Sequence, residues 1–329
     1  MNLRDILKSA DVRAPALDGA TAWLNSEPLT PDDLRGHVVA YDFWTYTCVN
    51  WLRTLPYLRA WDDRYREHGL IVVGIHTPEF VFERELDNVR EAVGVDRIDY
   101  PVALDSDYAI WEAFDNHYWP ALYLADATGA IRHHQFGEGE YERTEAVIQQ
   151  LLREAGYSGM GNNAVQVEPL GSEVAADWDN LRSQESYLGR DQAQGFVSES
   201  KPTVGKTAHY AAPLSLRLNQ WALSGDWTVN PGDVVLDKSN GRIVYRFHAR
   251  DLHLVMGPPA HGAAVRFRVL LDGQPPADAH GADVDQQGNG TATEQRMYQL
   301  IRQTKPIADR VFEIEFLDPG VEAYVFTFG

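Results

Sequence analysis

The residues most able to do chemistry surround the only cysteine, Cys48, in the stretch DFWTYTCVNWLR at positions 42–53. One cysteine allows no intrachain disulfide. An apolar, β-branched run at residues 37–44 predicts a buried strand before Cys48, and a helical pattern from residue 51 follows it. The sulfur is therefore expected at a helix N-terminus, where amide donors and the helix dipole stabilise a thiolate. The alternative is a buried, inert thiol.

Three polar residues near Cys48 are candidates for assisting it. Thr45 matches the hydroxyl that peroxiredoxins place against their reactive sulfur, although the proline those enzymes use seven residues before the cysteine is Tyr41 here. His76 and Glu79 follow the next predicted strand at the same sheet edge, so they are candidates for proton transfer. Thr45 can instead satisfy its own backbone, and His76 can be a structural histidine.

The elements that would hold these residues follow a β/α pattern from residue 36 to residue 155, which predicts a largely parallel sheet covered by helices. A kink is expected at Pro56 inside the first helix. The turn at residues 127–129 predicts an antiparallel hairpin. The expected strands are residues 37–44, 70–76, 121–126 and 130–136, and the expected helices are residues 51–68 and 144–155.

The second half of the chain has a different pattern. Apolar residues alternate with polar ones around Tyr245, Phe267 and Ile314, with Gly and Pro between the runs. Alternation of period two predicts an antiparallel β-sandwich. The expected organisation is an α/β domain at residues 1–156, a linker at 157–176 and a sandwich at 177–329.

Several motifs together resemble the TlpA and DipZ-type redoxins of the thioredoxin-like superfamily. The resemblance implies an α/β thioredoxin-like fold followed by a jelly-roll sandwich like that of carbohydrate-binding modules. It also implies a site built from Cys48 and Arg53, with Trp44, Trp119 and Pro120 around the sulfur and Pro120 as the family's cis-proline. The matching positions are Phe43-Trp44, Cys48, Arg53, Pro56, Tyr118-Trp119-Pro120 and residues 76–80, 133–140, 186–189 and 324–329.

The sequence departs from this family at one decisive position. The family motif is Cys-x-x-Cys, whose second thiol resolves the mixed disulfide, and here that position is Trp51. Dithiol exchange within one molecule is therefore impossible. The indole at this position is expected either to shield the sulfur or to stack on a planar substrate.

The second half offers two weaker candidates for binding. Asp283, Asp285, Gln287, Gly288, Thr291 and Glu294 have the spacing of a calcium loop, although position 5 is Gln and position 8 is Gly290. An acidic surface loop explains the same residues. The sandwich also carries Trp178, Trp221 and Trp227, which are candidate sugar platforms if exposed and core residues if not.

Composition excludes some partners. Lys and Arg total 29 against 48 Asp and Glu, a net charge of −19, which disfavours nucleic acid and anionic membranes. Residues 1–29 lack the apolar run of a signal peptide, and no stretch reaches the roughly 18 apolar residues of a membrane span. The sequence therefore predicts a cytoplasmic protein without a membrane partner, and we expect no cofactor.

These observations lead to a primary interpretation and two alternatives. The primary one is a thiol-dependent oxidoreductase or antioxidant redoxin that reduces peroxide or small disulfides through Cys48, recycled by an external small thiol or thioredoxin-type protein. The first alternative is a redox-inactive scaffold whose sandwich recognises a glycan or protein. The second is a redox switch through a covalent Cys48 dimer.

Overall fold

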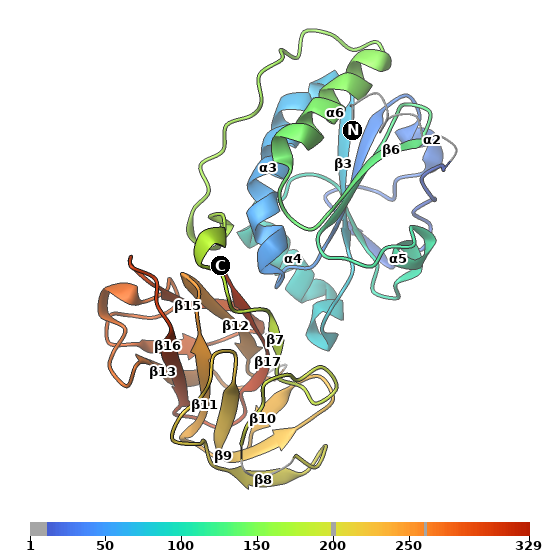
Figure 1. Cartoon of the computed structure of the whole chain (residues 1–329). Helices are drawn as coiled ribbons and strands as arrows, with labels where there is room; N and C mark the ends of the chain where they lie inside the picture. Colours follow the sequence, from blue (N-terminus) through green and yellow to red (C-terminus); the bar gives the residue numbers. More distant parts are fainter. Residues whose placement is uncertain (1–11, 199–201, 260–261) are drawn as a thin grey trace. The chain divides into compact units, whose positions relative to one another are not determined.

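The computed structural model describes residues 12–198, 202–259 and 262–329. Residues 1–11, part of the N-terminal stretch considered above, lie outside this description. The chain divides into two compact units, one ending at Val174 and the other beginning at Ala175 (Figure 1). Within the described ranges, no helix is both long enough and apolar enough to cross a membrane.

The first unit is built on a mixed sheet with the strand order β1-β4-β3-β2-β5-β6. Strands β2, β3 and β4 are parallel, while β1, β5 and β6 run antiparallel to their neighbours. The elements are β1 (Ala22–Leu24), α2 (Pro31–Leu34), β2 (Val38–Trp44), α3 (Val49–Tyr65), η1 (Arg66–His68), β3 (Leu70–His76), η2 (Val81–Arg84), α4 (Leu86–Val95), β4 (Val102–Leu104), α5 (Ala109–Ala113), β5 (Ala121–Ala125), β6 (Ile131–Phe136), α6 (Tyr141–Glu154) and η3 (Gly171–Glu173).

The central strand β2 places side chains alternately on the two faces of this sheet. Tyr41 and Phe43 join an apolar cluster with Ile75 and Phe114 on one face. The intervening positions, including Asp42, lie on the opposite face. Every residue of β2 is buried, as its composition, apolar except at Asp42, predicts for a strand covered on both sides.

The segment after α6 is held along the first unit by hydrogen bonds. The backbone N–H of Val165 donates to both carboxylate oxygens of Glu145, which is buried on α6. Near its end, Glu173 forms an ion pair of 2.5 Å with Arg59 of α3. Residues of the predicted linker therefore pack on these two helices. The limits of the linker, 157 and 176, stay a prediction.

The second unit is an antiparallel sandwich. One layer contains β14, β13, β16 and β11, and the other contains β10, β17, β12 and β15, with β9 shared between them. The elements are η4 (Trp178–Asn180), β7 (Ser186–Tyr187), β8 (Thr207–Tyr210), β9 (Trp221–Val229), β10 (Val234–Leu236), β11 (Gly241–Phe247), β12 (Asp251–Gly257), β13 (Val265–Leu271), η5 (Ala277–Ala279), β14 (Asn289–Ala292), β15 (Arg296–Arg302), β16 (Arg310–Phe316) and β17 (Glu322–Phe328).

Strand β9 passes from one layer to the other. Residues 221–224 pair with β11, whereas residues 227–229 pair with β10. Gly225 lies between these halves with φ +101°, in a region that glycine adopts without a steric penalty. Inward-facing residues of both layers, among them Tyr245 and Phe267, form one apolar core.

The predicted fold class is confirmed: an α/β thioredoxin-like fold is followed by an all-β sandwich. The period-two runs around Tyr245, Phe267 and Ile314 are strands β11, β13 and β16. The expected helix at 51–68 begins two residues earlier and ends three residues earlier, as α3. The expected helix at 144–155 begins three residues earlier, at Tyr141.

Candidate functional site

Cys48 is the N-cap residue of α3, between the end of β2 and the first turn of the helix. Its backbone is extended, with φ −76° and ψ 107°, and its N–H donates to the carbonyl of Thr45 at 3.2 Å. The side chain is partly exposed. The expected place of the sulfur at the start of a 17-residue helix is confirmed, and the amide groups of that first turn favour an anionic sulfur.

The loop from Thr45 to Thr47 is tied to the segment after β3 by a carboxylate that the sequence reasoning did not single out. Glu83 is completely buried and accepts a hydrogen bond of 2.6 Å from the Thr47 hydroxyl. Its other oxygen accepts the backbone N–H of Glu79 at 2.6 Å and that of Phe80 at 2.8 Å. Burial raises the pKa of Glu83. Thr45 is also completely buried in this loop.

Trp51 lies inside the core, three residues after Cys48. Its ring stacks on Trp44 with centroids 4.2 Å apart and an interplanar angle of 23°. Neither indole has exposed surface. Of the two roles expected for Trp51, stacking on a planar substrate is corrected, because the buried ring presents no face to a substrate. Shielding of the sulfur stays a prediction.

The indole N–H of Trp51 donates to Asp42 Oδ2 at 2.9 Å. Asp42 is completely buried, and burial raises its pKa to about 7 despite this hydrogen bond. Its second oxygen, Oδ1, has no hydrogen-bond partner among the described residues. Asp42 is therefore a carboxyl with a pKa near neutral pH that is hydrogen-bonded directly to the helix that begins after Cys48. The signal in the sequence that could have pointed to Asp42 is an acidic residue inside an otherwise apolar predicted strand.

Asp42 also lines a small cavity beside Pro120. The cavity measures about 10 Å³, and its polar lining includes Gln135 and Tyr141. The peptide bond between Trp119 and Pro120 is cis, as the family resemblance implied. The Trp119 indole N–H donates to the carbonyl of Thr77 at 3.1 Å. This loop is therefore joined to the end of β3.

Arg53 occupies the second turn of α3 and is buried. Its Nη1 pairs with Glu138 Oε1 at 2.9 Å and contacts Asn50 Oδ1 at 3.5 Å. Burial raises the pKa of Glu138, although the charge of Arg53 acts against this rise. The guanidinium therefore connects α3 to the loop before α6, and part of its charge is balanced there.

His76 lies at the end of β3 on the same face as Trp44. It has no exposed surface, and neither ring nitrogen has a hydrogen-bond partner in the part of the chain that the structure describes. The ring lies between Trp44, at 4.8 Å, and Tyr46, at 5.7 Å. Burial lowers the pKa of His76 to about 3, so the imidazole is neutral at physiological pH. Glu79 is nearby in sequence, but it is Glu83 that binds the loop of Cys48.

The candidate calcium loop in the sandwich has another arrangement. Asp283 and Glu294 both pair with Arg296, at 2.7 and 2.9 Å, and Asp285 accepts the backbone N–H groups of Gln287 and Asn289. No group of three metal-binding side chains occurs among the described residues. The loop prediction is corrected: these carboxylates stabilise a turn and a strand pair, and they do not converge on one point.

The three tryptophans considered as sugar platforms separate into two classes. Trp221 and Trp227 have 1% and 0% exposure, so for these two the alternative of core residues is confirmed. Trp178, in η4, is 61% exposed. A single exposed indole remains available on the second unit from that set.

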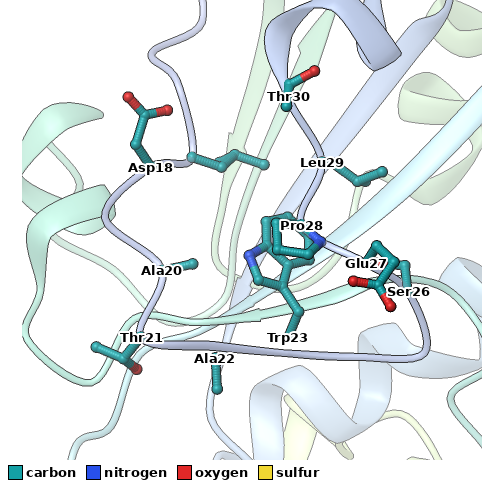
Figure 2. A pocket seen from close by; sticks show the side chains of 11 residues that line it. Asp18, Ala20, Thr21, Ala22, Trp23, Ser26, Glu27, Pro28, Leu29 and Thr30 are labelled. Atoms are coloured by element: carbon teal, nitrogen blue, oxygen red, sulfur yellow. The ribbon is translucent and has the colours of Figure 1, made fainter.

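A hollow of about 630 Å³ lies on the first unit, and none of the candidate site residues described above lines it. Its lining side chains belong to one continuous segment, residues 17–30, which curves around Trp23 (Figure 2). The lining has two carboxylates, Asp18 and Glu27, and several hydroxyls, but no cysteine and no histidine. We therefore centre the candidate site on Cys48.

The fold and this site define a thioredoxin-like protein: a parallel-strand core, a cysteine at a helix N-terminus and a cis-proline loop. Comparisons with known proteins agree. Residues 183–329 match the family described as "Thioredoxin like C-terminal domain". The thiol-disulfide oxidoreductase YkuV of Bacillus subtilis is 33% identical over 141 residues, which are 43% of this chain and 94% of YkuV. The chain belongs to the thioredoxin-like redoxin family.

A more extensive similarity is to protein DipZ of Mycobacterium tuberculosis, with 36% identity over 267 residues. The alignment covers 80% of this chain but only 37% of DipZ, so the chain spans little more than a third of that relative. The solution structure of a thioredoxin-like protein in the oxidized form shares 32% identity with this chain. It covers 43% of this chain and 95% of that one, with a TM-score of 0.40.

Proposed function

We propose that this chain is a thiol-dependent oxidoreductase of the TlpA/DipZ type that works through the single thiol of Cys48. The observation that carries the proposal is the position of Cys48 at the N-cap of α3, partly exposed, with Trp51 buried where the family motif has its second cysteine. Relatives named thiol-disulfide oxidoreductases support this class of chemistry.

The proposed cycle uses one external disulfide and one external thiolate. The Cys48 thiolate attacks one sulfur of a small disulfide, forms a mixed disulfide and releases the other sulfur as a thiolate. A second thiolate from solution then attacks the mixed disulfide, restores the Cys48 thiolate and leaves as a new disulfide. An external reductant, either a small thiol or a thioredoxin-type protein, is required because Trp51 supplies no sulfur.

Peroxide is the other substrate class that a lone thiol accepts. The Cys48 thiolate attacks the peroxide oxygen, which yields a sulfenic acid and an alkoxide or hydroxide. One external thiol then condenses with the sulfenic acid, which forms a mixed disulfide and releases water. A second thiol attacks this mixed disulfide, regenerates the Cys48 thiol and leaves as a disulfide with the first. This branch would make the protein an antioxidant. Thr45, buried beside the cysteine loop, is the residue proposed to contribute its hydroxyl.

The setting proposed for this chemistry is the cytoplasm, where small thiols are reduced and abundant. The net charge of −19 supports soluble partners over nucleic acid or anionic membrane surfaces. The second unit is proposed to be a carbohydrate-binding-module-like accessory domain for a glycan or a protein, with Trp178 as its exposed aromatic residue.

A second candidate function is a scaffold that has lost redox turnover. The burial of Trp51 and its hydrogen bond to Asp42 favour this alternative, because they make residue 51 part of the core. In that case Cys48 would be a remnant, and the second unit would carry the binding function.

The test is the intact mass of the reduced protein after a short exposure to a stoichiometric small disulfide, or to peroxide with a sulfenic-acid trap. We expect one adduct that is absent in Cys48→Ser. Addition of a small thiol should then remove the disulfide adduct and regenerate the starting mass over repeated cycles.

The outcomes separate the candidates. A disulfide adduct that a thiol removes supports the exchange cycle, and a trapped sulfenic acid supports the peroxide branch. If Cys48 reacts no faster than a free cysteine in either assay, the oxidoreductase proposal fails. Saturable binding of a glycan by the same preparation would then support the scaffold.

A further inference from the structure

Glu83 connects two segments that meet at the candidate site. It is the third residue of η2, and its Oε2 accepts the two backbone N–H groups that precede that short helix, those of Glu79 and Phe80. Phe80 is the N-cap residue of η2, so this carboxylate caps the start of that short helix. With one oxygen, therefore, the Glu83 carboxylate holds the turn after β3 in place.

The other oxygen reaches the cysteine loop. Thr47 Oγ1 donates to Glu83 Oε1 at 2.6 Å, and both residues are buried, at 2% and 0% exposure. Thr47 directly precedes Cys48, so this hydrogen bond restrains the residue next to the N-cap of α3. The two partners are 36 residues apart in the sequence, so this contact exists only in the folded chain.

The same turn is restrained from a third side. Thr77, just after β3, accepts the Trp119 indole N–H at its carbonyl, at 3.1 Å. Its hydroxyl donates to Asp105 Oδ2 at 3.1 Å. The turn that Glu83 stabilises is thus attached to the loop before Pro120 and to the residue after β4, which makes it a rigid support for Thr47.

We propose that Glu83 is a positioning residue for Cys48, acting through the Thr47 hydroxyl. It holds Cys48 at the N-cap of α3 with its sulfur near the amide groups of the first turn, and so sustains the reactivity of the thiolate. The inference rests on the proposed function because it assigns a role in the chemistry of that same cysteine. Glu83 itself needs no contact with a substrate.

The experiment measures the alkylation rate of Cys48 by iodoacetamide as a function of pH in the full chain. Thr47→Val removes the connecting hydroxyl and keeps the size of the side chain and the Glu83 cap of η2. We expect the pH midpoint of alkylation to rise by about one unit, which is a tenfold lower rate below the midpoint. Glu83→Ala should give the same shift, and the double variant should show no further shift.

Glu83→Gln distinguishes positioning from charge. A Gln side chain can accept the two backbone N–H groups with its carbonyl and donate its amide to the Thr47 hydroxyl, so it preserves the connection without the charge. We expect Glu83→Gln to restore a midpoint close to the native one. A Glu83→Gln midpoint equal to that of Glu83→Ala, or an unchanged midpoint in Thr47→Val, would overturn the proposal.

Two controls exclude a general loss of stability. Val89→Ala removes buried methyl groups from α4, close to Glu83 in the chain, and should lower stability without moving the alkylation midpoint. Glu85→Gln removes an exposed carboxylate two residues away and should change neither property. Alkylation does not require turnover, so failure of disulfide exchange with the midpoint shifts intact would reject the proposed function alone.

Discussion

Each unit of the chain buries an aspartate, and the two surroundings differ in charge. Asp42 in the first unit has 0% exposure, and its one hydrogen bond from a side chain is the neutral indole N–H of Trp51. Asp251 in the second unit has 1% exposure and is bound by Arg302, at 2.6 and 3.1 Å, and by Arg250, at 2.7 Å.

The pKa values diverge accordingly. Burial raises the pKa of Asp42 to about 7, and the Trp51 hydrogen bond only partly opposes it. Burial acts in the same direction on Asp251, but the hydrogen bonds from Arg302 and Arg250 outweigh it and lower the pKa below its usual range. Both side chains have almost no exposed surface, and it is the hydrogen bonds from the two arginines that reverse the direction of the pKa shift at Asp251. Asp251 is a permanent structural anion, whereas Asp42 is a group that titrates beside the cysteine helix.

Removing the two arginines that bind Asp251 should have the largest effect on stability. In the double variant Arg250→Met/Arg302→Met, Asp251 becomes a buried carboxylate without cations, and we expect a loss of roughly 5 kcal/mol in unfolding free energy at pH 7. Denaturant unfolding followed by Trp fluorescence measures it. Arg190→Met is the control, because its ion pair with Asp191 is exposed on both sides and should contribute little. A loss as small as that of the control would show that Asp251 is hydrated.

Asp42→Asn should remove a pH dependence from the first unit. Because the pKa of Asp42 in the folded protein is raised to about 7, the folded state holds more protons than the unfolded state between pH 4 and pH 7. Its contribution to stability therefore decreases as the pH rises through this window. We expect the stability of the variant relative to the native protein to increase by about 4 kcal/mol from pH 4 to pH 7. A constant difference across this window would contradict the shifted pKa.

His76→Phe tests a buried group on the same sheet face whose contribution to stability changes with pH in the opposite direction to that of Asp42. The pKa of His76 is lowered to about 3, so the folded state holds fewer protons than the unfolded state between pH 3 and pH 6.5. The histidine therefore costs stability as the pH falls through this window. Relative to the native protein, the variant should gain about 3 kcal/mol between pH 6.5 and pH 4.5, measured by urea unfolding. Equal pH profiles would indicate that the imidazole reaches water.

Trp51→Phe should give the smallest change in unfolding free energy, and it tests how far the Trp51 N–H stabilises the Asp42 carboxylate. The substitution keeps an aromatic ring in the core and removes the single N–H that the carboxylate accepts. We expect a loss of about 1 to 3 kcal/mol, larger at pH 8 than at pH 5, because the ionised carboxylate depends on the donor more than the acid does. If the loss were the same at both pH values, packing of the larger ring would account for it.

Much of the fold could be predicted because its elements carry strong local signals. The strands β2 and β3 are nearly unbroken apolar runs, and the sandwich strands alternate with period two. Helix ends were less certain: α6 begins at Tyr141, three residues earlier than the apolar periodicity indicated. Its first turn is polar and therefore lacks that periodicity, so only the hydrogen bonds of the folded chain reveal it.

The candidate site was partly predictable. Cys48 at a helix N-terminus and cis-Pro120 followed from neighbouring residues and from the family resemblance. The importance of Glu83 did not, because it depends on a contact with Thr47 across 36 residues. Glu79, closer to the end of β3, was singled out instead, since spacing alone does not reveal which carboxylate turns inward.

The sequence by itself determined that the chain has one thiol, that this thiol precedes a helix, and that an α/β domain is followed by a β-sandwich. These properties depend on composition and short-range periodicity. Only the tertiary structure decided the protonation of its buried groups. Asp42 and Asp251 are the same residue type in strands, and the arrival of Trp51 at one and Arg302 at the other sets opposite pKa shifts. Electrostatic free energy in a protein interior depends on which distant side chains desolvate or neutralise a charge, and those neighbours are assembled by folding.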